Sequence, residues 1–154
     1  QGKLQFFTSN NIGCTREAFL AAGGFDESFP MAAAEDREFG MRWRENGGQL
    51  IYAESAAVDH FHHLTMRRFW RQHQNYGAGA RHLHSVLDKR GSDLPRREPL
   101  AFYFKLIFGP LFRKRLRGLP VTALCFLSQI AMVWGYAAES RRKAGMQQSV
   151  DTTL

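Results

Sequence analysis

Two adjacent carboxylates, Glu35 and Asp36, are the strongest candidates for chemistry in this chain. They stand at the predicted start of a helix over residues 34–46, where the helix dipole favours the ionised form of a carboxyl group. An ionised carboxylate held in this way suits a general base, which takes a proton from a reacting hydroxyl group. The same pair also fits a solvated helix start whose negative charges only match the dipole.

The histidines are the second candidate group, because all six fall between residues 60 and 84. Three of them form the sequence His60-Phe61-His62-His63, directly after a predicted strand over residues 56–59. Neutral imidazole is the commonest metal ligand, and a strand end presents ligands rigidly. No cysteine pair accompanies the group, and its spacing is not that of a helix-borne zinc motif. Metal binding therefore stands beside ordinary surface histidines as an interpretation.

Aromatic and basic side chains alternate between residues 67 and 81, where Trp70 and Tyr76 could stack on nucleic-acid bases. The simpler interpretation is a helix with one face in the core and the other in solvent. Residues 77–80, Gly-Ala-Gly-Ala, lack the Lys-Ser/Thr ending of a phosphate-binding loop. No motif in the chain therefore favours nucleic acid as a partner.

Local signals predict the elements that must position these residues. Thr15 is the predicted N-cap of a short helix that Gly23-Gly24 end, and Thr65 is the predicted N-cap of a long helix to residue 89. Phe39 and Trp43, four residues apart, predict one packed face of the helix at 34–46. Strands are predicted over residues 4–8, 49–53 and 56–59.

The charge of the chain is unevenly distributed. Its 154 residues carry a net charge of +7, but residues 1–60 hold nine acidic and five basic side chains, and residues 61–154 hold five acidic and sixteen basic ones. Such a basic part suits phosphates, anionic lipid heads or nucleic acid. The two cysteines lie far apart, so a disulfide framework is excluded. The start carries no initiator Met and no signal sequence, and we expect a piece of a longer protein.

The last third of the sequence is apolar. Residues 99–112 are rich in aromatic side chains, and the twenty residues 119–138 carry no charge. About twenty apolar residues is the length of a transmembrane helix. Basic runs at 113–117 and 141–143 flank the second segment on both sides. This pattern favours helices that lie in the cytoplasmic interface of a membrane over a single crossing.

The order of the motifs is more informative than any one of them. Along the chain come Ser9-Asn10-Asn11, Gly23-Gly24-Phe25-Asp26-Glu27, Glu35-Asp36 and Val58-Asp59-His60. This set resembles the acceptor half of a family 2 inverting glycosyltransferase of the GT-A fold. The resemblance implies a partial α/β, Rossmann-like domain that is mostly helical here and is followed by apolar helices. It divides the chain into half of a catalytic domain (1–90), a linker (91–98), a membrane-associated helical tail (99–145) and a disordered terminus (146–154).

The resemblance also implies a role for each matching residue. Asp36 would be the catalytic base, and Glu35 would orient that base or the acceptor. His60 would complete a site for a divalent metal, Mn²⁺ or Mg²⁺. Substrate contacts would come from Asn10, Asn11, Asp26, Arg37 and Gln74.

One departure from the family is that the Asp-x-Asp triplet, which holds the metal and the nucleotide diphosphate, is not among these residues. We expect it upstream, with the nucleotide-binding half, and expect this piece alone to be inactive. The implied function is transfer of a sugar, of hexosyl type, from a nucleotide-sugar donor to a saccharide or lipid-linked acceptor. The implied location is the cytoplasmic face of a bacterial membrane, in the synthesis of cell-envelope polysaccharide. The alternatives are a non-catalytic basic module at the membrane surface and a nucleic-acid-binding module.

Overall fold

The computed structural model describes residues 8–61, 63–92 and 98–151, with backbone alone over 146–151. The chain forms two compact units, residues 1–63 and residues 64–154. The long helix α3 (Met66–Arg90) lies in the second unit, where it packs against α5 (Leu119–Asp151). The domain division expected from the sequence, with a linker at 91–98, stays a prediction.

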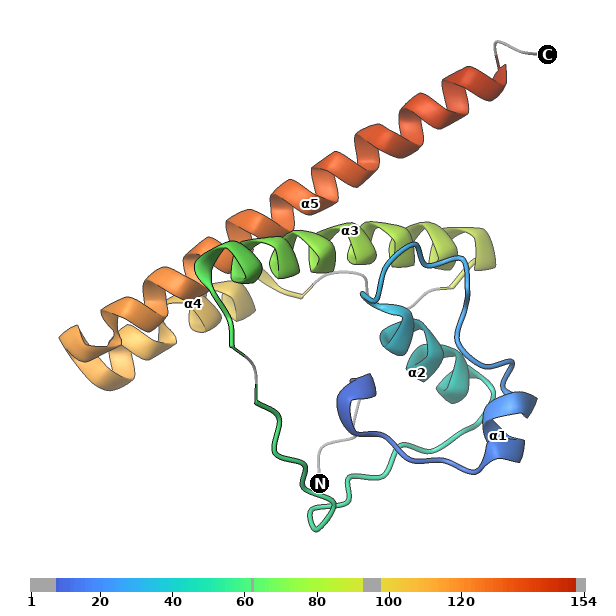
Figure 1. The fold of residues 1–154 in the computed structure, drawn as a ribbon, viewed down its shortest axis with the longest axis horizontal. Helices are drawn as coiled ribbons and strands as arrows, with labels where there is room; N and C mark the ends of the chain where they lie inside the picture. Colours follow the sequence, from blue (N-terminus) through green and yellow to red (C-terminus); the bar gives the residue numbers. More distant parts are fainter. Residues whose placement is uncertain (1–7, 62, 93–97, 152–154) are drawn as a thin grey trace. The chain divides into compact units, whose positions relative to one another are not determined.

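The first unit contains the 3-10 turn η1 (Ser9–Asn11) and the helices α1 (Arg16–Ala21) and α2 (Glu35–Glu45), blue to cyan in Figure 1. The predicted cap of α1 is confirmed, because the Thr15 hydroxyl accepts a hydrogen bond from the Ala18 N–H at 3.2 Å. After α1, Gly23 and Gly24 adopt φ of +83° and +64°. This left-handed backbone favours glycine and ends the helix as predicted.

Aromatic rings form the core of the first unit. The ring centroids of Phe19, Phe25 and Phe39 lie 5.3–5.4 Å apart, and Phe39 is only 2% exposed. Trp43 continues the cluster, with its ring 6.0 Å from that of Phe39, which confirms the packed face predicted from their spacing. These contacts join α1, the loop that follows it and α2.

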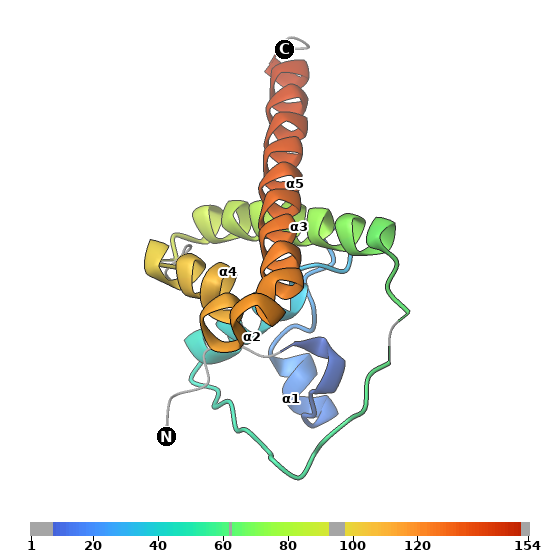
Figure 2. The same cartoon turned by 90° about the vertical axis from the view of Figure 1, so that its left-hand side faces the viewer.

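The second unit contains α3, α4 (Leu100–Lys114), the short turn η2 (Arg115–Gly118) and α5. Thr65 caps α3 as predicted, accepting from the Arg68 N–H at 3.3 Å, and Gly91 ends it at φ +67°. Figures 1 and 2 show that α4 and the first part of α5 form a helical hairpin and that α3 crosses α5. The backbone of α5 continues as a helix to Asp151.

Glycines allow α3 and α5 to approach closely. A methyl group added at Gly77 of α3 would overlap the backbone of Met132, and one added at Gly135 of α5 would overlap the backbone of Gln74. Ala131, on the same part of α5, is fully buried. Small residues at a crossing let helix backbones meet, and this packing is common between helices in membranes.

The predicted α/β, Rossmann-like fold is wrong for the residues that the structure describes, because none of them forms a strand. Residues 49–53 and 56–59 form irregular backbone on either side of a turn at 54–55, and residues 4–7 lie outside the described ranges. Ile51, Tyr52 and Val58 favour strands as residue types, yet they are 82%, 75% and 59% exposed. Strand preference depends on packing against a pleated neighbour, and no such neighbour exists within the described part.

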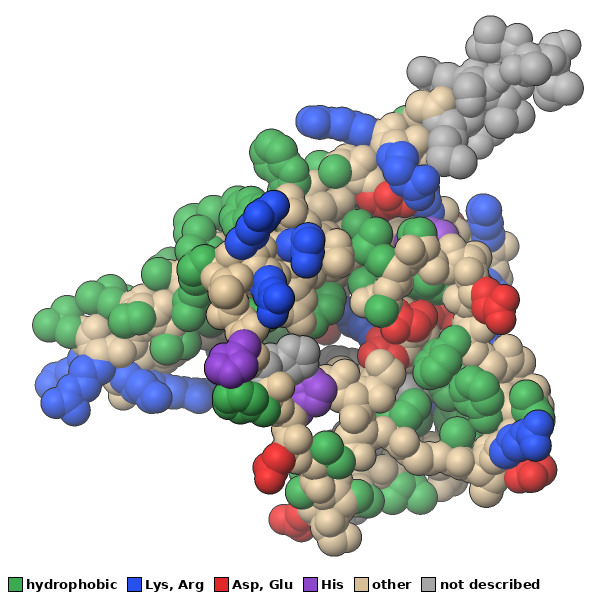
Figure 3. Space-filling view, in the orientation of Figure 1, with side chains coloured by type: hydrophobic (Ala, Val, Ile, Leu, Met, Phe, Trp, Pro, Cys, Tyr) green, Lys and Arg blue, Asp and Glu red, His purple; other side chains and the backbone are tan. Residues whose placement is uncertain are grey.

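The α4–α5 hairpin exposes much apolar surface. Within residues 100–145 one helical stretch is long and apolar enough to cross a membrane, with a mean hydropathy of 1.5 over its 18-residue window. Only 17% of that window is buried, which is unlike the core helix of a soluble protein. Figure 3 shows apolar side chains (green) along the hairpin and basic side chains (blue) at its far end, where η2 lies. A surface of this kind marks an interaction site.

Candidate active site

The first turn of α2 carries the Glu35-Asp36 pair on a strained backbone. The residue before it, Ala34, has φ +74° and ψ 0°, a left-handed conformation that costs a non-glycine residue about 1–2 kcal/mol. The Ala34 side chain cannot cap the helix, so the first turn depends on other groups to satisfy its N–H donors. Strain of this kind is concentrated at functional sites.

Asp36 is fixed by two backbone donors. Its Oδ2 accepts a hydrogen bond from the Ser9 N–H at 2.9 Å, and its Oδ1 accepts one from the Arg37 N–H at 2.7 Å. The carboxylate is half-buried, and each of its oxygens has a second lone pair for another donor. The two motifs at residues 9–11 and 35–36, which the sequence only placed in order, therefore meet through this side chain.

Glu35 differs from its neighbour in its surroundings. Its Oε2 is buried and has no hydrogen-bond partner among the residues that the structure describes. A buried acceptor without a donor costs about 1–3 kcal/mol. A group that retains such an acceptor at a helix start is suited to receive a donor from a bound molecule, such as a hydroxyl group.

Two further predicted contact residues lie in this unit with defined partners. Asn11 donates from Nδ2 to the Ala56 carbonyl oxygen at 2.5 Å, so η1 holds the irregular segment after α2. Asp26 accepts from the Ser28 N–H at 2.9 Å in a tight turn. Asn10 and Arg37 are exposed and present their side chains to solvent.

Two predicted site residues remain, His60 and Gln74. His60 lies in an exposed segment, and no group of three or more His, Cys, Asp or Glu among the described residues could hold a metal ion. His62, another histidine of the same group, lies outside the described residues. Gln74 belongs to α3 in the second unit, where it lines a pocket beside α5.

The ion pair between Glu38 and Arg42 was not predicted from the sequence. Glu38 is fully buried, and its carboxylate receives hydrogen bonds from Arg42, which raise the pKa of that guanidinium above its ordinary value. Arg42 also donates to the Ala22 and Gly24 carbonyl oxygens, so it ties the loop before Asp26 to α2. The i,i+4 spacing of an acidic and a basic residue was the available signal.

Comparison with known families assigns the chain to a class of sugar-transferring enzymes. Residues 1–140 match the model of Glycosyl transferase family group 2, and the chain therefore belongs to that family. Its activity class is sugar transfer, and the general partners of that class are a nucleotide-sugar donor and an acceptor. Comparisons with curated proteins and with solved structures give no match.

Proposed function

We propose that this chain contributes the acceptor side of an inverting sugar transfer, with Asp36 as the general base. The observation that carries the proposal is the position of the Asp36 carboxylate. It is half-buried on the first turn of α2 and is held by the Ser9 and Arg37 N–H groups. The preceding residue, Glu35, has a buried oxygen that lacks a hydrogen-bond partner among the described residues. Family membership supports an enzyme over either non-catalytic alternative.

The chemistry is a single displacement at the anomeric carbon of the donor sugar. The acceptor hydroxyl oxygen forms the new bond to this carbon, and its proton passes to the Asp36 carboxylate. The bond from the carbon to the diphosphate oxygen breaks, and the nucleotide diphosphate leaves with the electron pair. One displacement inverts the configuration, so no covalent nucleophile is required. Glu35 would accept a hydrogen bond from the acceptor and orient it.

The donor is a nucleotide-sugar, and the acceptor is a saccharide or a lipid-linked saccharide at the cytoplasmic face of the membrane. The exposed apolar side chains of the α4–α5 hairpin support the membrane location, among them Phe102, Phe104, Phe112, Leu119 and Phe126. The basic tip of this hairpin would lie among anionic lipid heads, because charged groups are costly in the hydrocarbon.

The described residues alone do not make a complete metal site. His60 as a ligand of Mn²⁺ or Mg²⁺ stays a prediction. In the proposed reaction this chain's own groups orient the acceptor and remove its proton.

The test is Asp36→Asn in the full-length protein, assayed for sugar transfer from the nucleotide-sugar donor. Asparagine preserves the shape and can accept one of the two backbone hydrogen bonds through its amide oxygen, but it cannot take the proton. Turnover should fall by roughly 10²–10⁴, the range for loss of a general base, while donor binding is kept. The matched control is Glu54→Gln, which neutralises an exposed carboxylate in the same unit and should leave turnover unchanged. A variant with more than about a tenth of the original turnover would remove Asp36 from this role.

A further inference from the structure

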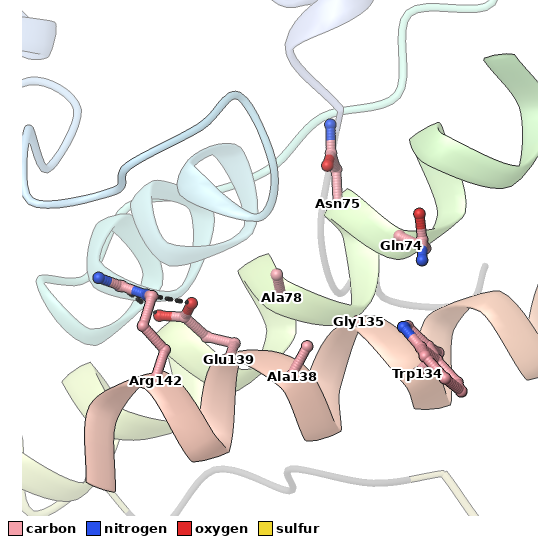
Figure 4. Close-up of a pocket in the computed structure, with 8 residues that line it drawn as sticks. All are labelled: Gln74, Asn75, Ala78, Trp134, Gly135, Ala138, Glu139 and Arg142. Carbon is pink, nitrogen blue, oxygen red and sulfur yellow. Dashed lines mark hydrogen bonds and ion pairs between the residues drawn. The ribbon is translucent and has the colours of Figure 1, made fainter. Parts of the chain in front are cut away.

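A shallow, open pocket of about 270 Å³ lies between α3 and α5, entirely within residues 64–154 (Figure 4). Three of its lining residues are small, Ala78 of α3 and Gly135 and Ala138 of α5. A Cβ at Gly135 would overlap the backbone of Gln74, so α3 itself covers this residue. The pocket therefore lies beside the close crossing of the two helices.

The polar lining of this pocket comes from both helices. Gln74 and Asn75 are consecutive residues of α3, and each amide offers hydrogen-bond donors and an acceptor. On α5, the buried Glu139 accepts from Arg142 Nε at 2.8 Å and from Arg142 Nη2 at 2.7 Å. Figure 4 shows this pair at one end of the pocket and Trp134 at the other.

Trp134 supplies an apolar surface at the pocket edge, since its side chain is 63% exposed. A sugar ring combines a face of C–H groups with hydroxyl groups around its rim. An indole can pack against the C–H face, and amides, carboxylates and guanidinium groups can form hydrogen bonds with the hydroxyl groups. The pocket offers both kinds of surface within one cavity.

The charges of the lining distinguish a sugar from a phosphate. Arg142 is the one cation among the described lining residues, and it is paired with Glu139. The Arg142 hydrogen bonds lower the pKa of Glu139, which keeps this carboxylate ionised. The negative charge of Glu139 beside the Arg142 guanidinium repels a phosphate. A neutral ligand with several hydroxyl groups can donate hydrogen bonds to the carboxylate and accept them from the guanidinium.

The geometry points to a binding site in this pocket for the neutral saccharide part of a lipid-linked acceptor. The inference rests on the proposed sugar transfer and names the place where the acceptor is held. The pocket lies where the uncharged segment of α5 ends and its charged segment, from Glu139 to Lys143, begins. A sugar attached to a membrane lipid lies at this boundary, with its lipid along the apolar helices.

The test measures sugar that co-purifies with the full-length protein from its own membranes in mild detergent. The Asp36→Asn background prevents turnover of the bound acceptor, and neutral sugar is quantified per protein after acid hydrolysis. In this background, Trp134→Ala should lower the bound sugar by roughly fivefold or more, because the packing surface is lost. Asn75→Ala, which shortens an exposed lining amide, should lower it in the same direction.

The matched control is Val133→Ala in the same background. Val133 is the chain neighbour of Trp134, is 70% exposed and does not line the pocket, so the bound sugar should be unchanged. The proposal is overturned if the Asp36→Asn protein and the double variant Asp36→Asn with Trp134→Ala bind equal amounts of sugar. It is also overturned if neither protein binds sugar. A loss of bound lipid phosphate without any sugar also overturns it, because the pocket would then take a phosphate head.

Kinetics separate this inference from the proposed function. With Asp36 intact, Trp134→Ala should raise the KM for the acceptor by roughly fivefold and leave the donor KM and kcat unchanged, and Trp134→Phe should restore much of the loss. If Asp36→Asn abolishes turnover while Trp134→Ala keeps the acceptor KM, the pocket assignment fails and the base assignment stands. If Asp36→Asn remains active but bound sugar still depends on Trp134, the base assignment fails and the pocket assignment stands.

Discussion

The Arg42 guanidinium donates two hydrogen bonds to the Glu38 carboxylate, from Nε to Oε1 at 3.0 Å and from Nη2 to Oε2 at 2.9 Å. Glu38 is fully buried, and Arg42 supplies a positive charge directly beside its carboxylate. Arg42 Nη2 also donates to the Gly24 carbonyl oxygen at 2.6 Å, and Nη1 donates to that of Ala22. One side chain therefore fixes the end of α1 relative to the helix that carries Asp36.

Arg42→Ala should strongly destabilise the first unit. Removing one partner of a buried ion pair leaves an uncompensated charge, which costs about 3–5 kcal/mol. The double variant Glu38→Met with Arg42→Met should lose less than Arg42→Ala alone, because no charge is left buried. Urea unfolding of the full-length protein measures the free energies. A loss below about 1 kcal/mol in Arg42→Ala would contradict the anchoring role.

Glu35→Met should increase stability and decrease activity. Methionine has a similar length and favours helices, and it removes the buried oxygen that lacks a described partner. The free energy of unfolding should rise by about 1 kcal/mol, and sugar transfer should fall by about tenfold or more. Urea unfolding and a transfer assay measure the two effects. Lower stability with full activity would show that Glu35 is a structural group.

Gly135→Ala should separate α3 from α5. The added methyl group would meet the backbone of Gln74, which cannot rotate away as a side chain can. We expect a loss of about 1–3 kcal/mol in the unfolding of the helical unit, measured by circular dichroism in detergent. Gly145→Ala is the control, since a Cβ there meets nothing within 4 Å. That change should be neutral or stabilising by up to about 1 kcal/mol through helix propensity.

His60→Ala should raise the Mn²⁺ or Mg²⁺ concentration required for activity in the full-length protein, because an imidazole ligand would be lost. His63→Ala is the comparison, and it should leave the requirement unchanged. A metal titration of sugar transfer measures both. Identical metal requirements in the two variants would exclude His60 as a specific ligand.

The α4–α5 hairpin should bind the membrane without crossing it. Salt should remove only part of the protein from membranes, because burial of apolar side chains is not screened. Alkaline carbonate should release it, and residues 141–143 should resist an external protease in intact cells. Full retention in carbonate together with external cleavage there would show that α5 spans the bilayer. If the protein is soluble without detergent, the hairpin neither lies in the membrane interface nor spans the bilayer.

The sequence by itself determined the elements whose signals are local. Thr15 and Thr65 cap their helices, and Gly23, Gly24 and Gly91 end them, because each acts on backbone groups within a few residues. The order of the short motifs also identified the family that the comparison confirms. Asp36 was a candidate from its type and position alone, and its role as a base stays a prediction.

Only the tertiary structure decided how distant residues meet. The strands expected at 49–53 and 56–59 are absent from the described residues, because their pairing and burial depend on neighbours that the local sequence does not specify. The hydrogen bond from Ser9 to Asp36, the ion pair of the buried Glu38 and the crossing at Gly135 likewise depend on which elements pack together. Local residue types fix a helix end, but burial and contact are properties of the assembled chain.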